Sequence, residues 1–397
     1  MMTTQSAEHI LDEILQRSQV ILQNIRAEYF APDAKKFLRR RFSITETARL
    51  VGKSAQAIRD AEAQGRVPEP EKDPRSKRRV GYRVEEVNRL REYFGTLPWR
   101  SEEDEPCVLA VQNFKGGVGK SAVSTHLSQY LAIKGYRVLV VDCDSQATTT
   151  AAFGYIPDEE ISPDETLLPF FEGSESDLEY CVKGTYWDQL DLIPSCLLLY
   201  NAEYSLAGYQ AHSDPREYQF YHQLGIGLET VKQHYDVVVI DSPPALGMIS
   251  MNVLYAANAI IIPVPPAMYD FSSTIQFFKM LREVMTRIGE EKAFSFFRIL
   301  ISKYEAASAS QNLFLQMMRD LYGRFVMEAV MAKTAEVQNA STAFSSVYEL
   351  EGASTSRRTY GRALGILDTV NAEIEQLIRL TWPSHARALR EKGIVGV

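Results

Sequence analysis

Apolar residues recur at helical spacing near the start of the chain. They form one stripe with polar flanks between Ser6 and about Phe30, and its members are Leu11, Ile14, Leu15, Ile21, Leu22 and Ile25. This pattern is typical of an amphipathic helix, and Pro32 ends it. Such a helix could pack on its own domain or pair with the same helix of a second copy. We interpret residues 1–34 as a dimerisation helix.

Short apolar runs alternate with helical intervals from residue 107 onward. Runs of this length separated by helices predict a parallel sheet that is covered on both faces. We therefore expect an α/β fold with a doubly wound, mostly parallel sheet over residues 107–397. The predicted strands are Cys107–Gln112, Arg137–Val141, Leu190–Ile193, Val237–Ile240, Ala259–Val264 and Arg298–Ser302. The predicted helices include Ser121–Ile133, Leu246–Ala256 and Ser272–Ile288.

The region between these two parts has the layout of two short helices joined by a tight turn. Ser43 and Glu46 have the spacing of a capping box at the start of the first helix. Gly52 lies in the turn, and Ser54 caps the second helix. Helix, glycine-containing turn and helix predict a helix-turn-helix, which a further helix at about Val84 to Phe94 would close.

Charge is unevenly distributed along the chain. Residues 35–100 contain 18 Lys and Arg against 9 Asp and Glu, whereas the whole chain carries a net charge of −8. A basic segment on an acidic protein suggests a module that binds a polyanion, although a solvated, Arg-rich surface has the same composition. Together with the helix-turn-helix pattern, the charge predicts a winged DNA-binding domain over residues 35–100. An acidic linker follows over residues 101–106.

The predicted DNA contacts of this domain fall into two groups. The start of the second helix would place side chains at base edges, and these are Ser54, Gln56, Ala57 and Arg59. The segment Pro68–Tyr82 is rich in proline and charge and could form a basic wing. Its contacts with phosphates would be Lys77, Arg78 and Arg79. A plain helical hairpin without a nucleic-acid partner is the alternative.

A glycine-rich segment follows the first predicted strand of the sheet and precedes a helix. Its sequence is Lys115-Gly116-Gly117-Val118-Gly119-Lys120-Ser121. The glycines let successive backbone N–H groups point inward and form an anion-binding nest at a helix N-terminus. Lys120 would reach the β- and γ-phosphates of a nucleotide, and the Ser121 hydroxyl would bind Mg²⁺. Phe114 stands where the usual pattern has its first glycine, but a turn without a ligand would leave the two flanking lysines unexplained.

Three acidic residues end two later strands. Asp142 and Asp144 follow one apolar run, and Asp241 follows another. Ligands of open α/β sheets lie at the carboxyl ends of strands, so we expect these three acids to face the glycine-rich loop. Acids at that place can hold Mg²⁺, usually through water, or position an attacking water. A single aspartate at a strand end is often a helix cap, but two such strands favour the functional interpretation.

These motifs resemble those of the ParA/MinD family of deviant Walker ATPases, over about residues 108–361. The segments Asp142–Gln146 and Asp241–Pro244 are similar to the second and third motifs of that family. The resemblance implies an ATP hydrolase in which Lys115 reaches across a dimer to the nucleotide of the partner. Asp144 would orient the attacking water. Ser145 stands where the family usually has a proline.

The same resemblance implies how the cofactors ATP and Mg²⁺ are held. Ser121, Asp142 and Asp241 would serve Mg²⁺, and backbone groups near Pro263 and Val264 would contact adenine. The nucleotide contacts implied in this way are Lys115, Gly116, Gly117, Val118, Gly119, Lys120, Ser121, Ala122, Pro263 and Val264.

The preceding helix-turn-helix makes the chain similar to the larger plasmid-partition ParA proteins, including the RepA proteins of repABC plasmids. The resemblance implies a homodimer that segregates plasmids and represses its own operon. It also implies slow ATP hydrolysis that a ParB-like, centromere-binding partner stimulates. Arg357 and Arg358 would add sequence-independent DNA contacts, although they could equally be two solvated arginines.

Other functions compete with this interpretation. A MinD-like ATPase at a membrane surface would need a basic amphipathic helix near the carboxy terminus. The segment Trp382–Arg390 is basic, but Ile394–Val397 does not continue it. A transcription regulator gated by ATP would carry the same motifs without a role in segregation. Because the sequence has no CxxC pair and no signal-peptide pattern, we expect a cytoplasmic protein. The family resemblance further implies association with the nucleoid and no membrane partner.

Overall fold

The computed structural model describes residues 6–29, 37–157, 159–214, 219–288, 292–342, 344–350 and 356–391. Its centre is a sheet in which eight strands are described, in the order β3-β4-β2-β5-β1-β6-β7-β8. All neighbouring strands are parallel except β3 and β4. The strands are β1 (Cys107–Val111), β2 (Val138–Asp142), β3 (Lys183–Gly184), β4 (Leu190–Ile193), β5 (Val237–Asp241), β6 (Ala259–Val264), β7 (Phe296–Tyr304) and β8 (Met331–Ala332).

The prediction of a doubly wound, mostly parallel sheet is therefore confirmed. Each of the six predicted strands is present, and β4 and β6 have the predicted bounds. Strands β3 and β8 were not predicted, because each has only two residues and lies at an edge of the sheet, where no apolar run is needed.

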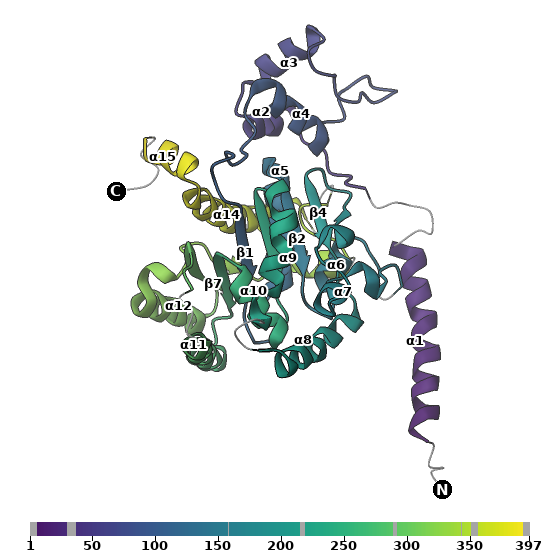
Figure 1. Cartoon of the computed structure of the whole chain (residues 1–397). Coiled ribbons are helices and arrows are strands. Elements are labelled where there is room, and N and C mark those ends of the chain that lie inside the picture. The colour runs from purple at the N-terminus through teal and green to yellow at the C-terminus, as the bar shows by residue number, and fades with distance from the viewer. Residues whose placement is uncertain are drawn as a thin grey trace.

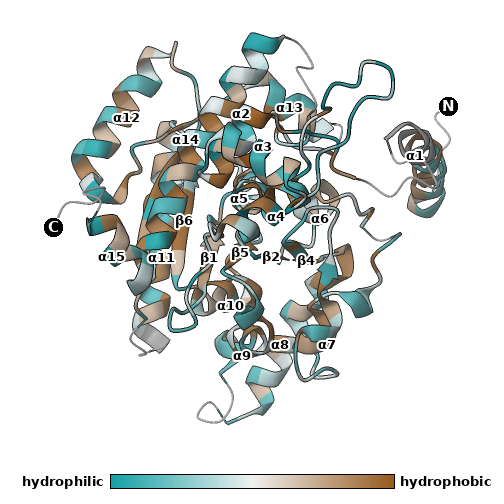
Figure 2. Ribbon diagram, turned by 90° about the horizontal axis from the view of Figure 1, so that it is seen from above, coloured by the Kyte–Doolittle hydropathy of each residue, from teal (hydrophilic) through white to brown (hydrophobic). Residues whose placement is uncertain are grey.

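Helices cover both faces of the sheet (Figure 1). Beyond the amino-terminal region they are α5 (Lys120–Lys134), α6 (Thr148–Ala152), α7 (Leu168–Phe171), α8 (Asn201–His212), α9 (Gln223–Val231), α10 (Met248–Ala256), α11 (Met268–Ile288), α12 (Ala309–Tyr322), α13 (Ala335–Thr342), α14 (Arg357–Thr381) and α15 (Pro383–Glu391). Helices α5 and α14 pack on one face, and α7 to α12 pack on the other. The central strands are consequently buried on both faces and apolar up to the aspartates that end β2 and β5, and β6 is brown in Figure 2.

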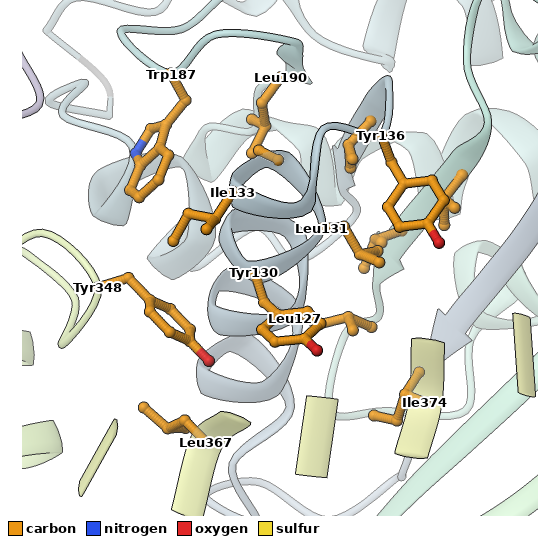
Figure 3. Close-up of a cluster of buried hydrophobic side chains, with 14 of the residues drawn as sticks. Leu127, Tyr130, Leu131, Ile133, Tyr136, Trp187, Leu190, Tyr348, Leu367 and Ile374 are labelled. Carbon is orange, nitrogen blue, oxygen red and sulfur yellow. The ribbon is translucent and has the colours of Figure 1, made fainter. Parts of the chain in front are cut away.

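Helix α5 lies at the centre of the first face. Twelve of its fifteen residues are buried, including its polar residues Ser124, His126 and Gln129. Figure 3 shows its apolar side chains between Trp187 on one side and Leu367 and Ile374 of α14 on another. The helix that follows the glycine-rich loop is thus fixed by packing along most of its length.

The predicted helix-turn-helix is present in the amino-terminal region. Helices α2 (Ile44–Val51) and α3 (Ala55–Ala63) are joined through Gly52, whose φ of 72° ends α2 in the left-handed conformation. The capping box of Ser43 and Glu46 is formed, and the Ser54 hydroxyl accepts a hydrogen bond from the backbone N–H of Ala57. Helix α4 (Val84–Phe94) packs against α2, as predicted.

The segment between α3 and α4 makes a short antiparallel hairpin. Lys72 and Arg79 form a bridge, and the backbone N–H of Asp73 donates to the carbonyl of Arg78 at 2.8 Å. A second bridge joins Phe42 to Tyr82. The predicted wing is therefore a real element of the fold.

Helix α1 (Ala7–Tyr29) stands apart from the sheet in Figure 1. Four residues of the predicted apolar stripe are exposed, namely Leu11, Ile14, Leu15 and Ile21, with exposed fractions of 54% to 60%. The side chains of Leu22 and Ile25, as well as Pro32, lie outside the described residues. An exposed apolar stripe on a helix of 23 residues is consistent with a partner helix.

The predicted linker, residues 101–106, is held against the carboxy-terminal helices. The buried carboxylate of Asp104 accepts hydrogen bonds from Ser101 and from the backbone N–H of Ser384 at the start of α15. The indole N–H of Trp382 donates to the carbonyl of Glu105 at 3.0 Å. The segment is a connection with a defined path rather than a loose tether.

Among the described helices, none is long and apolar enough to cross a bilayer.

Candidate nucleotide site

The glycine-rich loop runs from β1 into α5 at the carboxyl edge of the sheet. Gly117 and Gly119 have φ values of 72° and 102°, which residues with a side chain rarely adopt. A Cβ at either position would meet no atom within 4 Å, so the requirement for glycine is conformational rather than steric. The loop ends at Lys120, the first residue of α5, as the phosphate-loop interpretation predicts.

Two polar side chains brace this loop, one just after β1 and one in β7. The Asn113 amide accepts from the backbone N–H of Lys115 at 3.0 Å and donates to the carbonyl of Pro263 at 2.8 Å. The hydroxyl of Ser302, near the end of β7, donates to the carbonyl of Val118 at 2.8 Å. Neither brace was predicted from the sequence. A polar residue at the end of an otherwise apolar run was the available signal for each.

Lys120 is buried between the loop and the acidic strand ends. Its side chain is only 6% exposed, and its ammonium lies 3.4 Å from the carbonyl of Lys115. Burial lowers the pKa of Lys120, and the carboxylates of Asp241 and Asp144 oppose that shift. A lysine held next to two acids at a helix N-terminus is placed to bind phosphate oxygens.

Asp142 and Asp241 lie side by side at the carboxyl ends of adjacent strands. They occupy paired positions at the ends of β2 and β5, and both are completely buried. Asp142 accepts two hydrogen bonds from Thr150, at 2.8 Å from its backbone N–H and 2.7 Å from its hydroxyl. Asp241 accepts from the hydroxyls of Ser124 at 3.2 Å and Thr149 at 2.7 Å.

The environment of these two carboxylates disfavours two negative charges. Burial raises the pKa of Asp142, and the neighbouring Asp241 raises it further. Burial also raises the pKa of Asp241, against hydrogen bonds from Thr149 and Ser121 and the charge of Lys120. A divalent cation would relieve this repulsion, and the Ser121 and Asp241 oxygens are ligands that suit Mg²⁺.

The described oxygen donors do not form a metal-binding cage on their own. No group of three or more His, Cys, Asp and Glu able to hold a metal ion is found among the described residues. Mg²⁺ in nucleotide sites is usually bound by one or two protein oxygens together with phosphate oxygens and water. The arrangement of Ser121, Asp142 and Asp241 fits that mode and not a metal site independent of nucleotide.

Asp144 is placed differently from the other two acids. It is 8% exposed, and its carboxylate accepts one hydrogen bond, from the backbone N–H of Gln146 at 3.0 Å. Burial raises the pKa of Asp144, opposed by that hydrogen bond and by Lys120. Ser145 stands where the family usually has a proline, yet the segment still turns Asp144 towards Lys120.

The two predicted adenine contacts lie inside the sheet. Pro263 and Val264 are fully buried in β6, and the carbonyl of Pro263 is taken by Asn113. Pro263 therefore supports the loop. A contact of this segment with adenine stays a prediction, and its half-buried continuation begins at Pro265.

The predicted DNA-binding residues are mostly exposed. Ser54 is occupied by its capping role, and Gln56 donates to Asp60 on the same helix at 2.8 Å. The residues with exposed side chains in these groups are Ser54, Gln56, Arg59, Lys77, Arg78, Arg357 and Arg358, whereas Ala57 and Arg79 are half-buried. Arg79 differs from its neighbours because it pairs with the buried Glu62 at 2.6 Å. Arg79 thus supports the fold of the wing, a role that the sequence did not suggest.

Comparison with known proteins assigns the chain to a family. A family model described as an AAA domain matches residues 107–296. Protein SopA of Escherichia coli strain K12 is 40% identical over 362 residues, which cover 89% of this chain and 92% of SopA. The sporulation initiation inhibitor protein Soj of Bacillus subtilis strain 168 is 33% identical over 184 residues, which cover 46% of this chain and 68% of Soj.

The fold also matches a solved structure over nearly the whole chain. A structure named Partition Protein is similar with a TM-score of 0.64 and 17% identity, covering 94% of this chain and 99% of that one. The similarity to it shows the fold alone, including its extent beyond the sheet. With the SopA relationship and the loop geometry, it follows that this chain is a P-loop ATPase of the ParA/MinD family, of the larger plasmid-partition type.

Proposed function

We propose that the protein binds ATP–Mg²⁺ and hydrolyses ATP as a sandwich dimer on DNA, and that this cycle segregates a plasmid. The burial of Lys120 between the glycine-rich loop and the acids Asp144 and Asp241 carries this proposal. Burying the charged ammonium of a lysine destabilises the fold, and the phosphate oxygens of a bound nucleotide would compensate for that lost hydration.

Each residue of the site has a distinct role in the proposal. Lys120 and the backbone N–H groups of residues 116–121 hold the β- and γ-phosphates. Ser121, Asp142 and Asp241 would serve Mg²⁺, and the bound ion would neutralise charge that develops on the phosphates. Asp144 positions the attacking water, because its carboxylate has acceptor capacity left beyond the Gln146 hydrogen bond.

The dimer completes the site in this proposal. Lys115, at the start of the loop, reaches the nucleotide of the second subunit. Contacts to the γ-phosphate exist only before hydrolysis, so hydrolysis would dissolve the dimer. Turnover is slow until a ParB-like partner stimulates it, as the family resemblance implies, and the protein acts in the cytoplasm on the nucleoid.

DNA binding is proposed at two places. The domain of residues 35–100 recognises an operator through Ser54, Gln56, Ala57 and Arg59, with Lys77 and Arg78 on phosphates and Arg79 behind them. This domain would repress the operon of the protein. Arg357 and Arg358 at the start of α14 bind DNA without sequence preference; their exposure at a helix N-terminus supports this.

The deciding experiment measures binding to random-sequence duplex DNA with ATP, with ADP and without nucleotide, at one fixed salt concentration. Tight binding with ATP alone supports an ATP dimer that grips DNA. Equal binding in all three conditions would mean that the 35–100 domain acts alone, and an ATP-gated transcription regulator would replace partition. The variant Lys120→Ala controls for effects of ATP that do not pass through the loop.

A membrane-surface ATPase of the MinD type is the second alternative. Helix α15 has buried Ala386 and Leu389 on its inner side, so its apolar residues are already used in the fold. Flotation of the protein with anionic liposomes and ATP tests this alternative directly, and recovery with the liposomes would favour it.

A further inference from the structure

One arginine of the helix-turn-helix domain is buried against the helix that carries the phosphate loop. Arg91 of α4 is 1% exposed. Its guanidinium donates to the carbonyl of Ile133 in α5 at 2.7 Å and to the carbonyl of Leu50 in α2 at 3.3 Å. A further hydrogen bond goes to the side chain of Asn88. One side chain therefore joins α2, α4 and α5.

The residues around Arg91 allow α4 to approach the end of α5 closely. Gly135 ends α5 with a φ of 96°, and a Cβ there would lie 2.8 Å from a guanidinium nitrogen of Arg91. The indole N–H of Trp99 donates to the carbonyl of Gly135 at 2.9 Å. Asn88 also donates to Asp188 of the ATPase region at 2.7 Å. A side chain at position 135 would push the two helices apart.

The two ends of α5 thus make different interactions. Its amino terminus forms the phosphate loop, and the carbonyls of Ile133 and Gly135 at its carboxyl terminus accept hydrogen bonds from the DNA-binding domain. The end carbonyls of a helix carry partial negative charge, which a guanidinium neutralises. Burial lowers the pKa of Arg91 to about 10, so the group keeps its charge at neutral pH.

Helix α5 can carry a displacement between these ends. It has 15 residues, roughly 22 Å of helix, and is enclosed by packed side chains along this length, as Figure 3 shows. The buried residues Val51, Ile58 and Leu90 of the DNA-binding domain belong to the same apolar cluster as Leu127 and Leu131 of α5. The domain and the helix are therefore one packed unit.

We propose that Arg91 is a positioning residue through which α5 sets the orientation of the helix-turn-helix domain, so that nucleotide at the phosphate loop is sensed by the DNA-binding surface. This inference rests on the proposed nucleotide binding. A phosphate bound at one end of α5 restricts the motion of the helix. Through the hydrogen bonds of Arg91, the motion of α4 and α2 is restricted as well. By linkage, docking of the domain also changes the affinity for nucleotide by the same factor.

Hydrogen exchange of the full-length protein tests the proposal without knowledge of the operator. Exchange is compared without ligand and with a non-hydrolysable ATP analogue plus Mg²⁺, for the wild type, Arg91→Met and Arg89→Met. Arg89 is exposed on the same helix and serves as the matched control. In the wild type and in Arg89→Met, the analogue should slow exchange about fivefold or more in α2, α3 and α4, the low end of typical couplings.

In Arg91→Met the slowing should persist in residues 115–134 and fall below about twofold in α2, α3 and α4. Either of two results would overturn the proposal: wild-type protection confined to the ATPase region, or undiminished protection of α2 to α4 in Arg91→Met. Far-UV circular dichroism checks that Arg91→Met is folded, and Arg91→Lys, which keeps the charge but cannot span both carbonyls, should give an intermediate effect. Failure of the analogue to bind the wild type would instead contradict the proposed function.

Discussion

Asp142 and Asp241 occupy directly paired positions on adjacent parallel strands, and both carboxyl groups are fully buried. Their pKa values are raised above the ordinary value, mainly by burial. A carboxyl group of this kind binds its proton more tightly in the folded state than in the unfolded state. For each group, the free energy of unfolding therefore falls as the pH rises from the pKa of the unfolded state to the pKa of the folded state. Above the folded-state pKa, the full cost of burying the charged carboxylate remains.

Replacing one of these charges should stabilise the protein without ligand at neutral and higher pH. In Asp241→Asn, the hydroxyls of Ser124 and Thr149 can turn to accept from the new amide, so the hydrogen bonds persist. We expect the free energy of unfolding to rise on the order of 1–3 kcal/mol at pH 8 and to change little near pH 4. Denaturant unfolding at both pH values measures this.

The same variant should lose the stabilisation that Mg²⁺ adds to bound nucleotide, because the carboxylate that we propose holds the cation is gone. Asp320→Asn, on the exposed side of α12, is the control for a change of charge alone. Equal stabilisation by Mg²⁺–ADP in the wild type and in Asp241→Asn would exclude Asp241 from the metal site.

Lys120→Ala should abolish tight binding of ATP. A hydrogen bond to a charged group contributes about 1.5–3 kcal/mol, so the affinity should fall at least about tenfold. Calorimetric titration with ATP–Mg²⁺ gives the affinity. Lys134→Ala, at the opposite end of the same helix, should bind as the wild type does. Unchanged affinity in Lys120→Ala would refute the assignment of the loop.

Asp144→Ala should bind ATP yet fail to hydrolyse it. Loss of the group that positions the attacking water should lower turnover by about a hundredfold or more. Single-turnover hydrolysis and ATP affinity, measured on one preparation, separate the two steps. Normal turnover would remove Asp144 from the mechanism, and weak ATP binding would show that it supports the loop lysine Lys120 instead.

The chemistry of the loop could be predicted from sequence because it depends on local order. Glycines at fixed offsets between a strand and a helix determine where Lys120 and Ser121 point, and parallel strands bring Asp142 and Asp241 to one edge. The bracing of the loop by Ser302 joins positions 184 residues apart, and no local pattern encodes such a pair. The same holds for Arg91, whose acceptor Ile133 lies 42 residues further along the chain, in helix α5.

Burial changed the interpretation of several residues that the sequence assigned to a ligand contact or to a linker. Pro263 and Val264 belong to a strand that is covered on both faces, so only the residues after them can be partly exposed. The acidic segment 101–106 was expected to be a simple linker, but Asp104 is buried and hydrogen-bonded to Ser384. Composition does not distinguish a solvated acid from one, such as Asp104, whose carboxylate accepts hydrogen bonds from two hydroxyl groups.

Helix α1 should make a dimer that does not depend on nucleotide. Its exposed apolar stripe includes Leu11, Ile14 and Leu15 within two turns of helix. Ile14→Asp places a charge in the middle of that stripe and should convert the protein without nucleotide from dimer to monomer, as measured by light scattering after size exclusion. Arg17→Ala, on an exposed position paired with Glu13, should leave the dimer intact. A monomeric wild type would contradict the role of α1.

Arg78 and Arg79 are neighbours with the same charge but different environments. Arg78 is exposed on the wing, whereas Arg79 donates to the hydroxyl of Tyr82 at 2.8 Å and pairs with the carboxylate of Glu62, which has no exposed surface. Arg78→Ala should weaken binding to duplex DNA uniformly across sequences and reduce the salt slope by about one, with stability unchanged.

Arg79→Ala should act first on stability, because it leaves Glu62 buried without its partner. We expect a loss of roughly 1–3 kcal/mol, below the value for a fully buried pair, since the Arg79 side chain is itself 30% exposed. Thermal unfolding and DNA titrations of both variants at several salt concentrations separate the two roles. Equal stability of Arg79→Ala and the wild type, with a reduced salt slope, would show that Arg79 contacts DNA phosphates in the same way as Arg78.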